Sequence, residues 1–147
     1  MKNIKKIIDK LDFSGGPGSY FDFWHLHVDF DGDGNKDWKT RKKFMDEQLK
    51  AFEYLKKKLA TYPHLFQLWI GVDEDDSSQD GVYIHTPNPN SDYFPHLVES
   101  DDSVIFQSKE LKEYIERTGL TVIKSKNMDT NYYFLYDKNF GISLMTK

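Results

Sequence analysis

The sequence predicts an α+β fold, in which a mostly antiparallel sheet of about five or six strands carries helices packed on one face. Three observations support this prediction. Short, alternating segments typical of strands adjoin one another along the chain, apolar residues elsewhere recur at helical spacing, and the two kinds of segment do not alternate regularly. The 147 residues fit the size of one domain, so we expect residues 1–147 to form a single domain.

The first predicted elements are a short helix and a strand. Apolar residues recur at helical spacing near the N-terminus, at Ile4, Ile7, Ile8 and Leu11, before the glycine-rich segment 14–19. Residues 20–28 are rich in aromatic side chains and alternate in character, which predicts a strand with two unlike faces.

One long helix is predicted near residues 38–61, because apolar residues recur there at helical period while most lysines fall elsewhere. Its apolar stripe comprises Met45, Leu49, Phe52, Leu55, Leu59 and Tyr62. Pro63 lies just beyond the end of the pattern and stops the helix.

The segments 66–72 and 81–86 read as two strands of a hairpin, joined by the polar turn 73–80. If the aliphatic residues of both strands face the helices, then Trp69, Tyr83 and His85 point the opposite way, beside His25 and His27. We expect this second face of the sheet to be open.

The rest of the chain predicts a loop, a second helix and more strands. The loop is the proline-containing segment 87–92, and residues 103–106 suggest a short strand. Ser108 is suited to cap a helix that carries Leu111, Tyr114 and Ile115, and Gly119 is suited to end it. Further strands are predicted at 121–124, 132–136 and 142–145.

Composition excludes several classes of function. The formal net charge is -4, so no long-range field favours nucleic acid or an anionic membrane as a partner. The chain has no cysteine, which excludes disulfides, thiolate nucleophiles and cysteine-ligated metal centres. No segment resembles a signal peptide or a membrane span, and we expect a cytoplasmic, noncatalytic protein without a resident cofactor.

An acidic loop suggests calcium binding as one alternative. Aspartates and a glycine match the first, third, fifth, sixth and ninth positions of a calcium-binding loop, at Asp29, Asp31, Asp33, Gly34 and Asp37. The twelfth position, which supplies a bidentate glutamate in such loops, is Thr40. The other interpretation is structural: the glycines shape a turn and Asp37 caps the long helix.

A second alternative is a metal-dependent hydrolase. His25 and His27 project from one face of the predicted strand, and Asp29 continues the row, so the three side chains suit zinc. The usual extension of such a run by another histidine is missing, because the next residue is Phe30. Polar side chains on a sheet face explain the same pattern.

Acidic residues also concentrate in turns while the helices hold the lysines. The turn 73–80 contains Asp73, Glu74, Asp75 and Asp76, and aromatic residues such as Trp69 and Tyr83 lie in the neighbouring strands. Acidic patches beside aromatic side chains suit the docking of a basic protein. Together with Asp29, Asp31 and Asp33, these residues are the predicted partner-binding residues.

The chain resembles the small immunity proteins that bacteria encode beside polymorphic and contact-dependent toxins. The resemblance rests on its size, on the absence of cysteine, and on the segments 23–29, 32–35 and 82–90. It implies a tight, noncatalytic inhibitor whose acidic loops cover the basic active site of a cognate toxin, often a nuclease. It assigns no individual functional residue.

Overall fold

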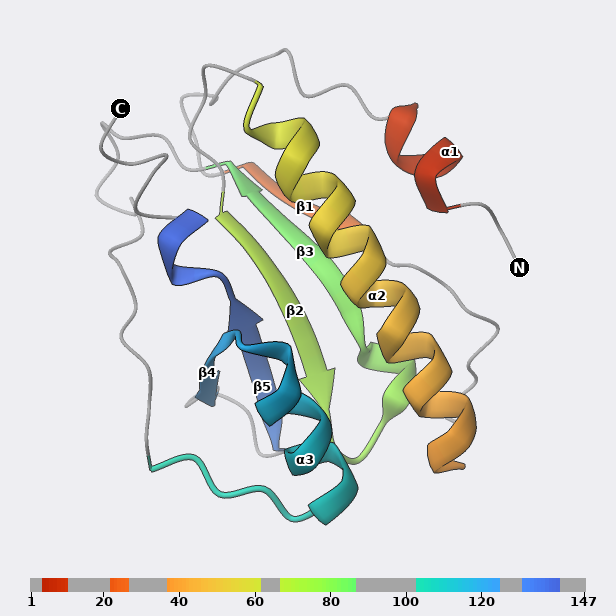
Figure 1. Ribbon diagram of the computed structural model, residues 1–147, viewed down its shortest axis with the longest axis vertical. Coiled ribbons are helices and arrows are strands. Elements are labelled where there is room, and N and C mark those ends of the chain that lie inside the picture. The colour runs from red at the N-terminus through yellow and green to blue at the C-terminus, as the bar shows by residue number, and fades with distance from the viewer. Residues whose placement is uncertain are drawn as a thin grey trace.

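The computed structural model describes residues 4–10, 22–26, 37–61, 67–86, 103–124 and 131–140 (Figure 1). The elements follow in the order α1 (Ile4–Asp9), β1 (Asp22–Leu26), α2 (Trp38–Leu59), β2 (Gln67–Asp73), the 3-10 helix η1 (Ser77–Gln79), β3 (Gly81–Thr86), α3 (Lys109–Thr118), β4 (Thr121–Lys124) and β5 (Tyr132–Tyr136). The predicted α+β class is confirmed.

The strands form one five-stranded sheet in the order β1-β3-β2-β5-β4. Every neighbouring pair is antiparallel, as predicted, and β2 and β3 form the expected hairpin. Strand β2 lies at the centre, where Trp69 is opposite Tyr83 on one side and Tyr136 on the other.

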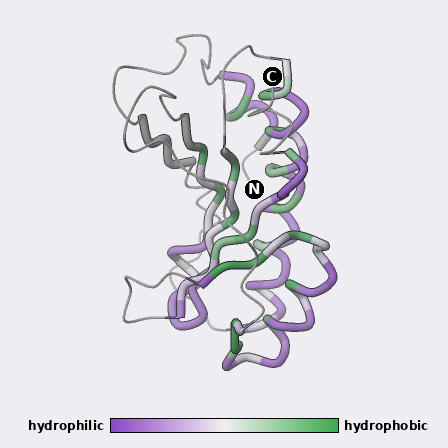
Figure 2. Tube along the Cα trace, turned by 90° about the vertical axis from the view of Figure 1, so that its left-hand side faces the viewer, coloured by the Kyte–Doolittle hydropathy of each residue, from purple (hydrophilic) through white to green (hydrophobic). Residues whose placement is uncertain are grey.

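The helices α2 and α3 lie on the same face of the sheet, and the side view separates the strands from the helices (Figures 1 and 2). This face is aliphatic because alternate strand residues point toward the helices. Its buried residues include Leu68, Ile70, Val72, Val82, Ile84 and Leu135, which pack with Met45, Phe52, Leu55 and Leu59 of α2 and Leu111 and Ile115 of α3.

The ends of both long helices follow from local sequence. Asp37 precedes α2, and its carboxylate accepts hydrogen bonds from the Lys39 amide at 3.3 Å and the Thr40 hydroxyl at 3.1 Å. Ser108 caps α3 by accepting a bond from the Leu111 amide at 3.2 Å, and Gly119 ends it in the left-handed region at φ 70°. All three roles were predicted.

Two expectations are wrong. Residues 103–106 form no strand, and the Ile105 carbonyl accepts a hydrogen bond from the Tyr133 side chain of β5 instead of from a neighbouring strand. The second face of the sheet is not open at its tyrosines, since Tyr83, Tyr132 and Tyr136 are each at most 7% exposed. The strand predicted at 142–145 lies outside the described residues.

No helix in the described ranges has the length and apolar character needed to cross a membrane.

Candidate functional site

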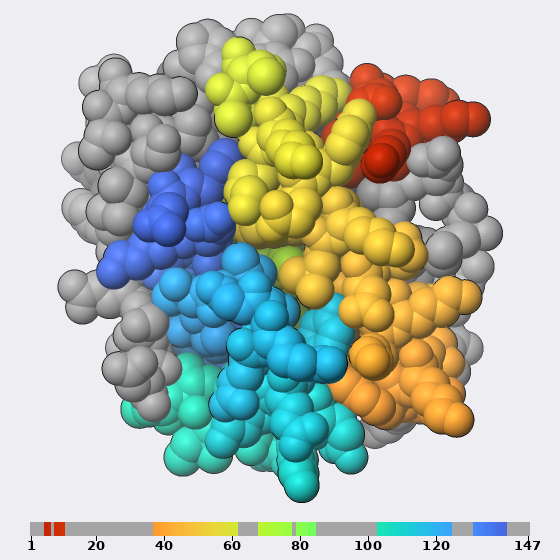
Figure 3. Space-filling model, in the orientation of Figure 1, coloured from red at the N-terminus to blue at the C-terminus, as the bar shows by residue number. Residues whose placement is uncertain are grey.

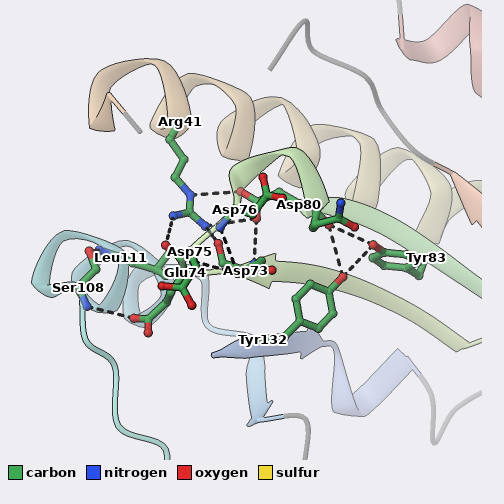
Figure 4. Close-up of polar contacts among 11 residues, drawn as sticks. Arg41, Asp73, Glu74, Asp75, Asp76, Asp80, Tyr83, Ser108, Leu111 and Tyr132 are labelled. Carbon is green, nitrogen blue, oxygen red and sulfur yellow. Dashed lines mark hydrogen bonds and ion pairs between the residues drawn. The ribbon is translucent and has the colours of Figure 1, made fainter. Parts of the chain in front are cut away.

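The acidic turn between β2 and β3, residues 73–80, is the most densely bonded polar region of the part of the chain described. We call it the hairpin turn. It begins at Asp73, includes the 3-10 helix η1 and ends at Asp80. Figure 4 shows its carboxylates facing the start of α2 on one side and the start of α3 on another.

Asp73 shapes the first half of the turn. It is 6% exposed, and its Oδ1 atom accepts hydrogen bonds from the amides of Asp75 at 2.8 Å and Asp76 at 3.1 Å. This arrangement is an Asx turn, in which an aspartate side chain takes the place of a backbone acceptor. The Asp73 carboxylate therefore stabilises the backbone of its own turn.

Asp80 and Arg41 join the turn to α2. Asp80 is 4% exposed, and its two carboxylate oxygens each lie 3.2 Å from a guanidinium nitrogen of Arg41, Nε and Nη2. Arg41 also donates to the backbone carbonyls of Asp73 and Glu74, so one buried side chain binds both ends of the turn (Figure 4). The Asp73 amide completes the site by donating to Asp80 Oδ1 at 3.0 Å.

Burial raises the pKa of Asp80 from 3.8 to about 6. The positive charge of Arg41 and the hydrogen bonds from Arg41 and the Asp73 amide act in the opposite direction and limit the rise. Asp80 is accordingly ionised at neutral pH, and the pair is a buried ion pair with its hydrogen bonds satisfied.

A pair of tyrosines supports the other side of the turn. The Tyr132 hydroxyl donates to the Tyr83 hydroxyl at 2.7 Å, and Tyr83 donates in turn to the Gln79 carbonyl at 3.1 Å (Figure 4). Burial raises the pKa of both phenols. The rings lie against Gly71, where an added Cβ would be 2.2 Å from the Tyr132 hydroxyl oxygen and 2.5 Å from the Tyr83 ring. Glycine at 71 therefore permits this arrangement.

Glu74 connects the turn to the segment before α3. Its Oε1 atom accepts hydrogen bonds from the amides of Gln107 at 2.8 Å and Ser108 at 3.0 Å. Its Oε2 atom is 3.3 Å from the Tyr133 hydroxyl, which donates to the Ile105 carbonyl at 2.7 Å. The turn is thus attached to α2, to β5 and to the start of α3.

The remaining acidic side chains of the turn face outward. Asp75 is exposed and Asp76 is partly exposed. The segment from residue 103 to the start of α3 lies at the lower edge of the molecule, at the surface beside α3 (Figure 3). Glu74 bonds the turn to the end of this segment, through the amides of Gln107 and Ser108.

Other residues predicted to bind a partner or a metal lie elsewhere. Trp69 is half-buried on the aromatic face of the sheet, with its ring centroid 5.0 Å from that of Tyr136. Asp37 caps α2, as described above, and Thr40 at the twelfth loop position donates to it. Asp29, Asp31, Asp33 and His27 lie outside the described residues, and so does the side chain of His25.

No group of three or more potential metal-ligating side chains occurs within the ranges that the structure describes. His25 itself lies opposite Tyr83 in the register of β1 and β3.

The sequence interpretation missed Arg41, Asp80 and the tyrosines of β5. Arg41 had a detectable signal, because it lies four residues before Met45 and therefore on the apolar stripe of α2. A charged residue on such a stripe indicates a buried partner. Nothing local identified Asp80 as that partner, since 39 residues separate the two.

Comparison with known proteins gives no relative for this chain: no family model, no curated protein and no solved structure matches it.

Proposed function

We propose that this chain is a noncatalytic protein-binding protein, and specifically an immunity-type inhibitor that uses its acidic loops to cover a basic surface of a toxin. The observation that supports this proposal most strongly is the construction of the hairpin turn. An acidic segment is held in one conformation by the Arg41–Asp80 ion pair, the Asp73 Asx turn and the Glu74 contacts.

Rigidity matters for binding because a loop that is already ordered loses less conformational entropy when it meets its partner. Carboxylates fixed on such a loop attract a basic partner over a distance and reject acidic ones. A preorganised acidic turn therefore favours fast and selective association with a basic protein.

The predicted contact residues of the turn differ in burial. Asp73 and Glu74 hold the turn from inside, whereas Asp75 and Asp76 present carboxylates at its surface. In this proposal the inner pair positions the outer pair. Asp29, Asp31 and Asp33 are proposed to add carboxylates to the contact, and the half-buried Trp69 to add an aromatic side chain. Tyr83, which is 7% exposed, supports the turn from inside.

The experiment uses the product of the reading frame directly upstream of this gene. That product is expressed from an inducible promoter in a heterologous bacterium, with and without this chain. We expect the upstream product to stop growth, this chain to restore it, and the two purified proteins to form a complex by calorimetry. A harmless upstream product, or toxicity that this chain leaves unchanged, contradicts the inhibitor function.

A further inference from the structure

We infer that Ile105 is the apolar anchor of a protein contact surface, rimmed by Asp75 and Glu110, and that its partner is a protein with an apolar socket surrounded by lysine and arginine. This inference rests on the proposed protein-binding function and names the surface that performs it. Ile105 is 77% exposed. No other large hydrophobic side chain in the described part of the chain is classed as exposed.

Exposure alone does not mark a binding site, because single apolar side chains occur on most protein surfaces. Ile105 is distinctive in how firmly its segment is fixed. Side chains alternate between exposed and partly buried from Ser103 to Ser108, so the segment presents alternate residues outward. The two residues that flank Ile105, Val104 and Phe106, are partly buried.

Four contacts fix this segment. The Tyr133 hydroxyl donates to the Ile105 carbonyl at 2.7 Å, and the Phe106 ring lies 4.6 Å from the Tyr133 ring, centroid to centroid. Glu74 accepts from the amides of the next two residues, Gln107 and Ser108. The backbone at Ile105 is thereby already ordered. A partner that buries this side chain therefore costs little conformational entropy.

The charges around Ile105 indicate the chemistry of the partner. Asp75 is exposed and follows Glu74, which bonds to the Ile105 segment. Glu110 is exposed on the first turn of α3, with its Oε2 atom 3.4 Å from the Ser108 hydroxyl oxygen. Lys109 lies four residues after Ile105, and its side chain is 86% exposed with its Nζ atom 4.0 Å from Glu113. Two of these three exposed charged residues are therefore acidic.

An acidic rim disfavours a second copy of the same chain as the occupant, because an isologous contact centred on Ile105 would bring like charges together. A partner that presents lysine and arginine around an apolar depression satisfies both the isoleucine and the carboxylates. This is the occupant that we propose.

The test places a photo-crosslinking amino acid at position 105 in the full chain, expressed in its host cells, with the same amino acid at position 60 as the control. Ala60 is exposed at the opposite end of α2. We expect one heterologous, basic protein to be crosslinked from position 105 and not from position 60.

The affinity of that crosslinked protein is then measured for two matched variants, Ile105→Lys and Ala60→Lys. Ile105→Lys should weaken binding by at least about 30-fold, because it removes the apolar anchor and places a positive charge against the lysines and arginines of the partner. Ala60→Lys should leave the affinity unchanged. Thermal unfolding of both variants should match the wild type because both positions are exposed.

Four outcomes overturn the inference: no crosslink at 105, equal crosslinking at both positions, a crosslink to a second copy or to an acidic protein, or an unchanged affinity of Ile105→Lys. Failure of the proposed function is distinguishable. A basic partner that is not a toxin supports the surface and removes the inhibitor function. If Ile105→Lys and the wild-type chain neutralise a toxin equally well, the inhibitor function is supported and the role of the Ile105 surface is refuted.

Discussion

The inside and the outside of the hairpin turn use the same residue type for different purposes. Asp73 and Asp80, at its two ends, are 6% and 4% exposed and accept hydrogen bonds from Arg41 and from backbone amides. Asp75, two residues after Asp73, is exposed. This acidic run therefore combines buried carboxylates that hold the conformation of the turn with a carboxylate that is exposed at the surface.

The difference arises from position in the hairpin. Asp73 is the last residue of β2 and pairs with Tyr132 of β5, while Asp80 directly precedes β3, so both lie at the packed end of the hairpin strands. A carboxylate placed there loses solvation and requires a cation or donors. Asp75 lies beyond the strand and has no such requirement.

The largest predicted effect is on the inside. Arg41→Met removes the cation and leaves Asp80 buried without a counter-charge, and it removes donors from two backbone carbonyls. We expect the free energy of unfolding at pH 7 to fall by about 3–5 kcal/mol in urea titrations. Asp75→Asn is the matched outside variant and should change it by less than about 0.5 kcal/mol. Equal losses in the two variants would remove the distinction between inside and outside.

The stability lost in Arg41→Met should depend on pH. Because burial raises the pKa of Asp80 to about 6 in the folded protein, against 3.8 when exposed, its contribution to stability decreases as pH rises from about 4 to about 6. Arg41 limits this rise in pKa, so its removal makes the decrease larger. The stability lost in Arg41→Met should be greater at pH 7 than at pH 4.5. A loss that is identical at both values contradicts the buried ion pair.

Variants of Glu74 test whether this side chain attaches the turn to the segment before α3. Glu74→Ala removes the acceptor for the amides of Gln107 and Ser108, and we expect a loss of about 1–2 kcal/mol in the same urea titration. Glu74→Gln keeps an acceptor oxygen and should recover most of that loss. If both variants are as stable as the wild type, the turn is not attached to the start of α3 in the way described.

The smallest effect extends the comparison along α2. Gln48 is 1% exposed, and its Oε1 atom has no hydrogen-bond partner in the described structure, whereas all three guanidinium nitrogens of Arg41 donate hydrogen bonds. Gln48→Met preserves the shape and removes the cost of burying that oxygen, so the thermal midpoint should rise, with a gain of about 1 kcal/mol. Gln79→Met, at an exposed position, is the control and should be neutral. A destabilised Gln48→Met would indicate that Gln48 is bonded after all.

The sequence predicts those features of the fold that depend on neighbouring residues. Asp37, Ser108 and Gly119 act within one helical turn, so their roles as caps follow from residue type and spacing. The hairpin strands were recognised for the same reason, because alternation and a polar turn are local signals.

The candidate site depends on distant contacts, and the sequence could not supply them. The pairing of Arg41 with Asp80 requires α2 to lie across β2 and β3, and the two tyrosines that meet over Gly71 come from β3 and β5. Asp73, Glu74, Asp75 and Asp76 of the turn 73–80 were all predicted to bind a partner, because polar composition does not reveal which carboxylates the fold encloses. The same limit explains why the second sheet face was expected to be open.

The central claim is that the hairpin turn is a rigid element held from inside by its own carboxylates. Hydrogen exchange of individual amides tests it most directly, because the amides of Asp73, Asp75 and Asp76 each donate to a carboxylate of the turn. We predict that these three amides exchange far more slowly than in an unstructured peptide, and that Arg41→Met removes the protection at Asp73. Exchange at the unstructured rate in the wild-type protein would contradict the account.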